Sequence, residues 1–584
     1  MPPGGYPLIL EMPFWICARY FRKSGLHKYK RKNQRKVKIP MENYERRWFG
    51  TMLDCSRNAV MNVDSVKRWI DITSDLGYNM LMLYTEDTYE IKNQPYFGYM
   101  RGRYSIQQMK EINAYCASRG MELIPNIQTL AHLNAITRWP AFAPLIDQKD
   151  FLLVGDERVY DLIDEMFATV SQTHTSKYVH VGMDEAKGLG RGKYQDIHGT
   201  YNVAEMFVSH IKRVAEIAKK YGKTILVWGD MFHTLMGPGK HLDLPEDFDR
   251  TICDQIPENV EIVCWEYDKP YVEFYDGRIK SHNRIRENSW YTGAFRSWLA
   301  LTPHNAYSLK HIKSVMTACQ MNQVRDLFFA HWGNDGAECS RFAFLPSLFY
   351  AAQLYKGITD EEEIKKAFQE KFGIAWDDFM LLDLPDSPNG LDDGLYTADK
   401  YLLYNDPFLG LMDSTLNGTE DGAYALCAKK LSQVSLEHPW AYLFETQKAL
   451  SEVLAIKANL GNRTRSAYQN KDHAALKKVI GEYEAVEEKL EVFYKAYRKQ
   501  WYTENKGFGF EVQDVHIGGL KQRIRHCKEM LMAYEAGELP CIEELEEKRL
   551  DFTGNGEDFT QKPLLYGYWD RIITANMIVE ARFE

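Results

Sequence analysis

The sequence contains no run of 18 apolar residues, so we expect no transmembrane helix. Its ten cysteines are scattered, and none forms a Cys-x-x-Cys pair. Metal-ligand spacing is therefore absent, and a disulfide framework is not expected in so long a chain, which predicts reduced thiols and a cytoplasmic location. The first residues, Met-Pro-Pro-Gly-Gly-Tyr-Pro, lack a charged segment, and Glu11 and Pro13 interrupt the apolar stretch, so no signal peptide is predicted.

An excess of positive charge is also missing. The formal net charge is -9 and the isoelectric point is about 6.0, which does not favour a nucleic-acid partner. Segment 1–45 differs, because ten Lys or Arg residues and no acid lie between Arg19 and Lys38. No folded basic module follows this segment. We therefore interpret residues 1–45 as a flexible tail or as the remnant of an α/β domain, in preference to a basic arm for an anionic partner.

A regular alternation of short β-rich runs and amphipathic helices extends from residue 46 to residue 354. Runs such as 79–84 and 223–228 are almost entirely apolar, as expected of strands buried on both faces of a parallel sheet. The helices between strands end at glycines such as Gly77 and Gly222, which are helix stop signals. Eight strands are predicted, over 49–54, 79–84, 121–127, 177–182, 223–228, 260–265, 290–296 and 325–332.

Eight strand–helix units over about 300 residues predict an α/β fold of the (β/α)8 TIM-barrel class. The alternative is an open doubly wound sheet, which usually carries a glycine-rich phosphate turn after its first strand, and Asp54-Cys-Ser-Arg57 is not such a turn. After residue 355 the strand pattern disappears, and apolar residues recur at helical spacing over 476–497 and 520–534. Residues 355–584 are therefore predicted to form an α-helical C-terminal domain.

In such a barrel the active site lies at the C-terminal ends of the strands. Carboxylates and tryptophans recur there, without a glycine-rich phosphate loop or a histidine cluster, so neither a cofactor nor a metal is implied. This combination suits a neutral polyhydroxylated ring, because carboxylates and arginine bond hydroxyl groups and an indole covers the apolar face of a sugar. The strand-end residues are Asp54 and Arg57, Glu86 and Asp87, Gln128 and His132, Asp184 and Glu185, Trp228 and Asp230, Trp265, Glu266 and Tyr267, Trp298, and Trp332, Asp335 and Glu338.

The segment Tyr178-Val-His-Val-Gly-Met-Asp-Glu185 carries the sharpest chemical signal. Neighbouring residues of a strand point to opposite faces, so Asp184 and Glu185 reach one site only if the strand ends there, and Gly182 favours such an ending. Two carboxyl groups side by side leave one protonated and one ionised, which general-acid cleavage of a glycosidic bond requires. The alternative without chemistry is an acidic pair at a helix N-terminus.

His180-Val-Gly-Met-Asp-Glu185 matches the signature of glycoside hydrolase family 20, the β-N-acetylhexosaminidases, and the chain resembles that family over about residues 48–345. Segments 443–447 and 504–509, together with several in the barrel, look most like a bacterial branch with a helical C-terminal domain. The barrel segments are Met52–Arg57, Tyr84–Ile91, Pro95–Tyr99, Gln128–His132 and Thr302–Asn305.

The resemblance implies an exo-acting, retaining enzyme that removes terminal N-acetylglucosamine or N-acetylgalactosamine from glycans or glycoconjugates. It also implies substrate-assisted catalysis, in which the sugar's own 2-acetamido oxygen attacks C1 and forms an oxazolinium intermediate. Glu185 would be the general acid and then the base, and Asp184 would hold and polarise the acetamido N–H. Holding the acetamido oxygen beside C1 supplies the proximity advantage of an intramolecular reaction.

By the same resemblance, further residues are predicted to bind the substrate. Arg57 would bind the ring 3- and 4-hydroxyls, Tyr267 would hydrogen-bond the acetamide, and His132 would support the catalytic acid. Glu338, with Asp335 as a second candidate, would bind the outer hydroxyls. The walls of the acetamido pocket and the sugar face would come from Trp228, Trp298 and Trp332. Each tryptophan could instead be a core residue that needs only a partner for its N–H group.

The chain departs from the family pattern in two places. Many members carry Pro-Glu-x-Asp-x-Pro-Gly-His on the third strand, whereas the segment here is Pro125-Asn-Ile-Gln-Thr-Leu-Ala-His132. Asn126 and Gln128 replace both acids, which changes the support expected for Glu185. Members also usually carry an α/β domain before the barrel, and the atypical residues 1–45 cannot form one.

Two other functions are alternatives at this level. One is a barrel glycosidase with an enzyme nucleophile at Glu86, Asp230 or Glu266, and the other is a non-catalytic sugar-binding or scaffold protein. The choice between glucosamine and galactosamine depends on the orientation of one hydroxyl and is open. A glycan is the expected partner, and a membrane is not. The amphipathic helical faces predict a homodimer, although internal packing explains them equally well.

Overall fold

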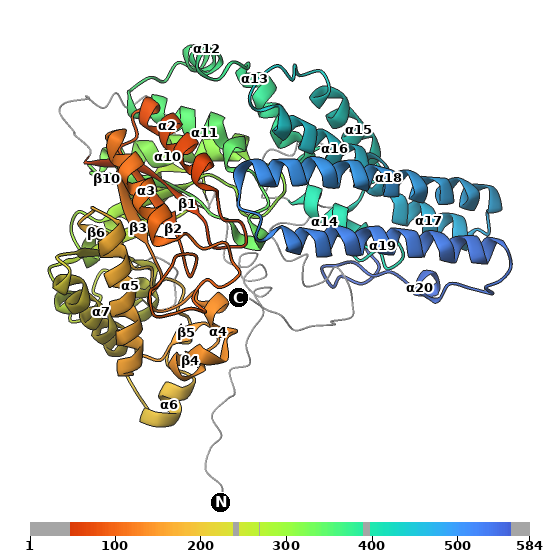
Figure 1. Cartoon of the computed structure of the whole chain (residues 1–584). Helices are drawn as coiled ribbons and strands as arrows, with labels where there is room; N and C mark the ends of the chain where they lie inside the picture. Colours follow the sequence, from red (N-terminus) through yellow and green to blue (C-terminus); the bar gives the residue numbers. More distant parts are fainter. Residues whose placement is uncertain (1–46, 238–243, 268, 389–396, 562–584) are drawn as a thin grey trace, which may run out of the picture. The chain divides into compact units, whose positions relative to one another are not determined.

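A closed barrel forms the first part of the computed structural model, which describes residues 47–237, 244–267, 269–388 and 397–561 (Figure 1). Eight parallel strands close it in the order β1-β10-β9-β8-β7-β6-β3-β2, which confirms the predicted (β/α)8 class. Each predicted run overlaps one strand. The strands are β1 (Trp48–Asp54), β2 (Met80–Tyr84), β3 (Glu122–Asn126), β6 (Tyr178–His180), β7 (Thr224–Trp228), β8 (Val260–Trp265), β9 (Trp290–Ala294) and β10 (Asp326–His331).

Helices alternate with the strands and begin and end at local signals. In α2 (Val63–Leu76) the Asn62 side chain accepts the backbone N–H of Ser65, and Gly77 ends the helix with a φ of 95°, which glycine adopts without a Cβ penalty. The other helices of this region are α3 (Ile106–Ser118), α4 (Asn134–Thr137), α5 (Glu157–Thr173), α6 (Lys193–His198), α7 (Val203–Lys220), α8 (Asp230–Met236), α9 (Val272–Ile285), α10 (Asn305–Met321) and α11 (Leu345–Tyr355). A separate antiparallel pair, β4 (Ile146–Gln148) and β5 (Phe151–Leu152), follows α4.

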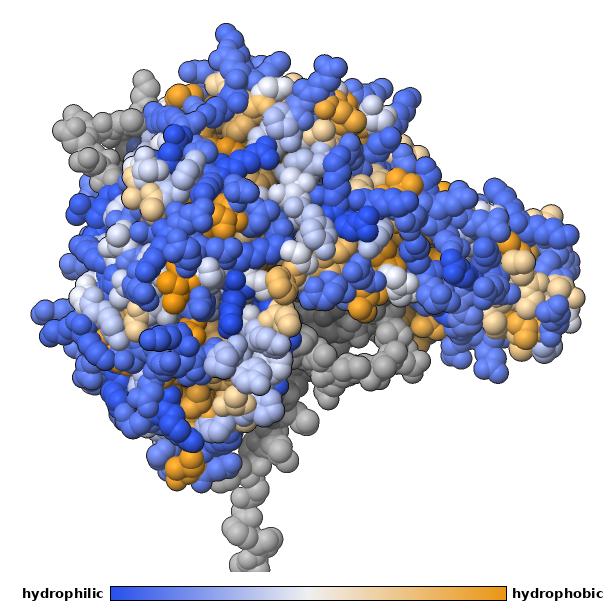
Figure 2. Space-filling view, in the orientation of Figure 1, coloured by the Kyte–Doolittle hydropathy of each residue, from blue (hydrophilic) through white to orange (hydrophobic). Residues whose placement is uncertain are grey.

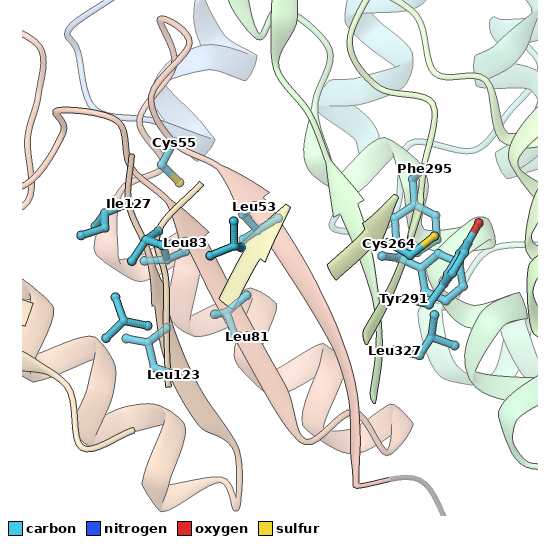
Figure 3. Packing of buried hydrophobic residues seen from close by; sticks show 14 of the residues in the cluster. Leu53, Cys55, Leu81, Leu83, Leu123, Ile127, Cys264, Tyr291, Phe295 and Leu327 are labelled. Carbon is cyan, nitrogen blue, oxygen red and sulfur yellow. The ribbon is translucent and has the colours of Figure 1, made fainter. Parts of the chain in front are cut away.

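The barrel strands bury side chains on both faces, which explains their nearly continuous apolar sequence. Met80 and Met82 of β2 belong to the core inside the barrel. Leu81 and Leu83, which alternate with them, belong to the core between the strands and the helices. Figure 3 shows these two leucines beside Leu123 of β3. Because successive side chains of a strand point to opposite faces, each strand contributes side chains to two hydrophobic cores.

Beyond β10 the described residues are helical. Helices α18 (His473–Glu504) and α19 (Phe510–Glu535) lie side by side, and α18 also packs on α16 (Ala441–Lys457) (Figure 1). The apolar stripe predicted from sequence is the buried face of α18, formed by Leu476, Val479, Tyr483, Val486, Leu490, Phe493 and Tyr497. The remaining helices are α12 (Glu361–Phe372), α13 (Trp376–Phe379), α14 (Ala398–Tyr404), α15 (Glu420–Leu431), α17 (Leu460–Gln469) and α20 (Glu543–Glu546).

Polar contacts join the barrel to the helical region. The Glu504 carboxylate at the end of α18 accepts hydrogen bonds from the hydroxyls of Ser340 and of Tyr442, the latter at 2.8 Å. Lys400 of α14 pairs with Glu338, which follows β10. The described residues between 47 and 561 belong to one compact unit, so the domain boundary at residue 355 stays a prediction. The basic segment 1–45 lies outside the described residues.

No helix in the described ranges is long and apolar enough to cross a membrane. The face of the molecule in Figure 2 is largely hydrophilic, with apolar residues scattered over it. Isolated exposed apolar residues, such as Val492 with 51% exposure, are normal on protein surfaces. The apolar stripe of α18, by contrast, is buried in an internal core.

Replacing Leu490 with alanine should destabilise the helical region, because this fully buried side chain would leave a cavity in the core. We expect the free energy of unfolding to fall by about 2–5 kcal/mol, measured by urea denaturation followed by circular dichroism. Val492→Ala on the same helix is the matched control and should change it by less than about 0.5 kcal/mol. Equal effects of the two substitutions would contradict the burial of this stripe.

Candidate active site

The chain turns sharply after β6, and this turn brings two acidic side chains together. The strand ends two residues before Gly182. Gly182, Met183 and Glu185 then have φ angles of 70°, 71° and 52°, which residues with a Cβ atom seldom adopt. As a result Asp184 Oδ2 and Glu185 Oε2 lie 3.3 Å and 3.8 Å from Nε2 of His132. Both carboxylates therefore face one point at the barrel mouth.

The two acids differ in exposure and in their electrostatic surroundings. The Asp184 side chain is 10% exposed and that of Glu185 is 47% exposed. Burial would raise the pKa of Asp184, but the charge of His132 and a hydrogen bond from Gln128 hold it below its usual value. Burial would lower the pKa of His132, but the Asp184 carboxylate raises it to about 9. At neutral pH Asp184 is thus a buried anion beside an imidazolium, and Glu185 is the accessible carboxyl group.

Gln128, in the loop after β3, orients Asp184. Its Nε2 donates to Asp184 Oδ1 at 2.9 Å and to the hydroxyl of Tyr84 at 2.9 Å. Its Oε1 accepts the backbone N–H of Met183 at 3.1 Å, so the amide N–H groups must face the carboxylate. A Cβ atom at Gly182 would lie 1.9 Å from Oε1 of Gln128. A neutral donor therefore supports Asp184 where many family members carry an acid.

Arg57, just beyond β1, is held by acids and covered by aromatic rings. Its Nη1 lies 3.1 Å from Asp54 Oδ2, and its Nε lies 3.4 Å from Glu86 Oε1. Its guanidinium carbon lies 5.1 Å and 5.0 Å from the ring centroids of Tyr84 and Trp332. The guanidinium carries five N–H donors, more than these carboxylates take up, so it can also bind hydroxyl groups.

Aromatic side chains predicted from sequence form one wall of the mouth. Trp332 Nε1 donates to the hydroxyl of Tyr267 at 3.2 Å. The ring of Tyr267 meets that of Trp298 edge-on, with centroids 5.7 Å apart. Trp228 lies 6.1 Å from Trp332 but is fully buried, so it supports the wall from inside the barrel. The structure thus brings these four predicted residues together.

Glu338, predicted to bind outer hydroxyls, contacts the helical region. Its side chain is buried and pairs with Lys400 of α14. No contact recorded for the described residues joins it to Arg57 or Asp184. Binding of outer hydroxyls by Glu338 stays a prediction. The side chain of Asp335, the second candidate, lies outside the described part of the chain.

Two side chains of the site have contacts that differ from the roles suggested by the sequence. Gln128 is a neutral amide, and Asp230 is a single acid at the start of α8. Asp230 is buried, and it accepts the backbone N–H of Glu185 at 2.9 Å and the indole N–H of Trp265 at 3.3 Å. The sequence placed Gln128 and Asp230 just beyond barrel strands, with Gln128 as the replacement of a family acid and Asp230 as a candidate nucleophile. Within the described residues, no group of three or more His, Cys, Asp or Glu side chains is arranged to hold a metal ion.

Adjacent carboxylates, an arginine held by acids and a wall of aromatic rings meet at the C-terminal ends of the barrel strands. Carboxyl groups can exchange protons and bond hydroxyls, and aromatic rings cover the apolar face of a sugar. On a (β/α)8 barrel these features define a site of the glycosidase class.

Two models of a single family match the chain. The model "Glycosyl hydrolase family 20, catalytic domain" matches residues 46–326. The model "Glycoside Hydrolase 20C C-terminal domain" matches residues 377–562. The matches together include well over half of the chain, which belongs to glycoside hydrolase family 20.

The relatives that the chain resembles carry related names. Hexosaminidase D of Homo sapiens is 30% identical over 209 residues, which are 33% of this chain and 39% of that protein. A Beta-N-acetylhexosaminidase of Cellulomonas fimi is 24% identical over 217 residues, 33% of this chain and 41% of that protein. A solved structure of a GH20 exo-β-N-acetylglucosaminidase from Vibrio harveyi has a TM-score of 0.42 and 16% identity, covering 55% of this chain and 56% of that chain. The chain thus spans about half or less of the length of these relatives.

Replacing Gly182 with alanine should destabilise the site, because the new Cβ would lie 1.9 Å from Gln128 and φ is 70°. We expect a loss of about 1–3 kcal/mol in the free energy of unfolding, measured by urea denaturation. Gly277→Ala in α9 is the control, because a Cβ there meets no atom within 4 Å. It should be neutral or stabilising by up to about 1 kcal/mol, as expected inside a helix. Similar losses in both variants would show that the turn does not depend on Gly182.

The pair between His132 and Asp184 predicts a pH-dependent stability. The carboxylate raises the pKa of His132 from 6.5 to about 9, so the stabilisation is fully present below about pH 6.5 and is lost as the pH rises through about 9. The difference in melting temperature between the unsubstituted protein and His132→Gln should therefore be larger at about pH 6 than at about pH 10. Calorimetry at both pH values measures it, and an equal difference would contradict the pairing.

Proposed function

We propose that this chain is an exo-acting, retaining β-N-acetylhexosaminidase that hydrolyses terminal N-acetylglucosamine or N-acetylgalactosamine from glycans or glycoconjugates. The observation that carries the proposal is the arrangement of Asp184 and Glu185 around His132, with one acid buried and ionised and the other accessible. The family match and the hexosaminidase names of the relatives support the same substrate class.

In the first step Glu185 is the proton donor. It transfers its proton to the glycosidic oxygen as the bond from C1 to that oxygen breaks. The carbonyl oxygen of the substrate's 2-acetamido group attacks C1 from the opposite face and forms a cyclic oxazolinium ion. The Asp184 carboxylate accepts the acetamido N–H and stabilises the positive charge that develops on the group. A buried anion suits this role because its charge is little screened by water.

In the second step the Glu185 carboxylate is the base. It takes a proton from water as the water oxygen attacks C1 and the oxazolinium ring opens. The acetamido group is restored, the sugar is released with a new C1 hydroxyl, and Glu185 regains its proton. Two attacks from opposite faces leave the configuration at C1 unchanged, so the overall reaction is hydrolysis with retention.

The remaining side chains bind the sugar. Arg57 donates to ring hydroxyls, and the indole of Trp332 and the rings beside it cover an apolar face. The Tyr267 hydroxyl accepts the indole N–H of Trp332 and has its own proton available for the acetamide oxygen. This proton is retained at neutral pH, because burial raises the pKa of Tyr267 well above its usual value.

The alternative mechanism would use Glu86, Asp230 or Glu266 as an enzyme nucleophile. Glu86 accepts a hydrogen bond from the Tyr84 hydroxyl at 3.0 Å and lies beside Arg57. Asp230 accepts two hydrogen bonds, and Glu266 is buried and accepts the backbone N–H of the next residue at 2.9 Å. Each of the three candidate carboxylates is thus engaged by other groups of the protein.

The proposal predicts that a chromogenic N-acetyl-β-glucosaminide is hydrolysed and that Glu185→Gln lowers kcat by about 100-fold to 10,000-fold, because the amide cannot donate the proton. Glu157→Gln is the matched control, since this carboxyl lies on α5 with 71% of its side chain exposed. It should leave kcat unchanged. Equal turnover by Glu185→Gln and the unsubstituted protein would contradict the assignment of the acid.

The same assay tests the origin of the nucleophile. A substrate of the same configuration without the 2-acetamido group should not be cleaved, because the attacking oxygen is missing. A galactose-configured N-acetyl substrate run in parallel measures the epimer preference. Efficient cleavage of the substrate without the acetamido group would refute substrate assistance and favour an enzyme nucleophile.

A further inference from the structure

Asp230 is a buried acid whose carboxylate contacts residues at the ends of two other barrel strands. It is the first residue of α8 and is 3% exposed. Its Oδ2 accepts the backbone N–H of Glu185, in the turn after β6, at 2.9 Å. Its Oδ1 accepts the indole N–H of Trp265, the last residue of β8, at 3.3 Å. One carboxylate at the end of β7 therefore connects its two neighbouring strands.

Each of the two donors belongs to a different part of the proposed machinery. Glu185 has a φ of 52°, a strained conformation that surrounding contacts must maintain. The ring of Trp265 stacks on that of Tyr267, with centroids 5.4 Å apart and an angle of 29° between the planes. Tyr267 in turn accepts the indole N–H of Trp332. The first contact fixes the backbone of the proton donor, and the second fixes the aromatic wall.

We propose that Asp230 is a positioning residue, which holds the backbone of Glu185 and, through Trp265, the Tyr267–Trp332 wall in one fixed geometry. This inference rests on the proposed hexosaminidase function. The proposal gives Asp230 no contact with the glycosidic oxygen or C1, because its two oxygens accept protein N–H groups. It acts by fixing the distance between the proton donor and the groups that hold the acetamide, and small displacements of such groups have large effects on rate.

The chemistry of the two contacts explains why an acid stands at this position. Both partners are N–H donors, so both oxygens of the side chain must accept. A carboxylate has two acceptor oxygens, whereas an asparagine has one oxygen and one N–H₂ group. An asparagine at this position would turn a donor toward either Glu185 or Trp265, and one of these N–H groups would lose its bond to residue 230. Burial and the negative charge of Asp184 also raise the pKa of Asp230 above its usual value, so the charge itself is held at a cost that the two donors offset in part.

The test is a double-mutant cycle with Asp230→Asn and Trp265→Phe, assayed on the chromogenic N-acetyl-β-glucosaminide. Asp230→Asn should lower kcat by about 100-fold, with KM changed far less, because the donor is displaced while the sugar contacts remain. Trp265→Phe keeps a ring on Tyr267 but removes the indole N–H, and it should have a smaller effect. Asp254→Asn is the control for the loss of one negative charge, since this side chain is 67% exposed, and it should not change kcat.

The double variant gives the decisive result. Without the indole N–H, the asparagine can direct its oxygen to the Glu185 N–H and its N–H₂ group into the space left by the indole nitrogen. The double variant should therefore be at least about tenfold faster than Asp230→Asn alone, a coupling expected only of residues in direct contact. Multiplicative losses in kcat, with no such recovery, would overturn the positioning role.

Melting temperatures of the four proteins keep the inference testable if Asp230→Asn folds poorly. In Asp230→Asn, the N–H₂ group of the asparagine faces another N–H donor, which should lower the stability. Removing the indole N–H with Trp265→Phe should therefore restore part of this stability in the double variant. A double variant as unstable as Asp230→Asn would count against the inference. Failure of the proposed function looks different, because the unsubstituted protein would then not hydrolyse the N-acetyl substrate at all. An active unsubstituted protein with additive losses would refute only the role of Asp230.

Discussion

Two adjacent acids can serve one site only because the backbone leaves the extended conformation just before them. On a continuing strand, Asp184 and Glu185 would face opposite sides of the barrel wall. The left-handed turn that starts at Gly182 places both at the mouth, and its strain is offset by backbone hydrogen bonds to Gln128 and Asp230. The carboxylate positions, the role of Gln128 and the requirement for glycine all follow from this turn.

The acids around the turn have different charged neighbours, and this difference gives them different roles. The imidazolium of His132 and the nearby Arg57 stabilise the Asp184 anion, so its pKa is lowered although the group is buried. Asp230 is buried as deeply but receives only neutral N–H donors, and the charge of Asp184 raises its pKa. Two neighbouring buried carboxyl groups thus have pKa values shifted in opposite directions, and the more exposed Glu185 remains accessible to exchange a proton with a ligand.

The helical region contacts the loop that carries one side of the barrel mouth. The loop after β10 carries Trp332 and then enters contacts with α14 and α18, through the pairs of Glu338 with Lys400 and of Ser340 with Glu504. The change of sequence pattern near residue 355 marks the change from the barrel to the helical region, and these contacts make the two regions continuous. The sequence pattern could not show this continuity, because hydrophobic periodicity reports which face of an element is buried and not which element covers it.

The sequence by itself determined the barrel class, the ends of α2 and α7 and the acidic pair, because strands buried on both faces, helix-stop glycines and the Asp184-Glu185 motif are all local patterns. Tertiary structure alone decided which group supports which acid. Gln128 turned out to orient Asp184, Asp230 to contact Glu185, and Glu338 to pair with Lys400 of the helical region. These partners come from strands and helices far apart in the chain. Their pairing depends on the closure and register of the barrel, which no local pattern encodes.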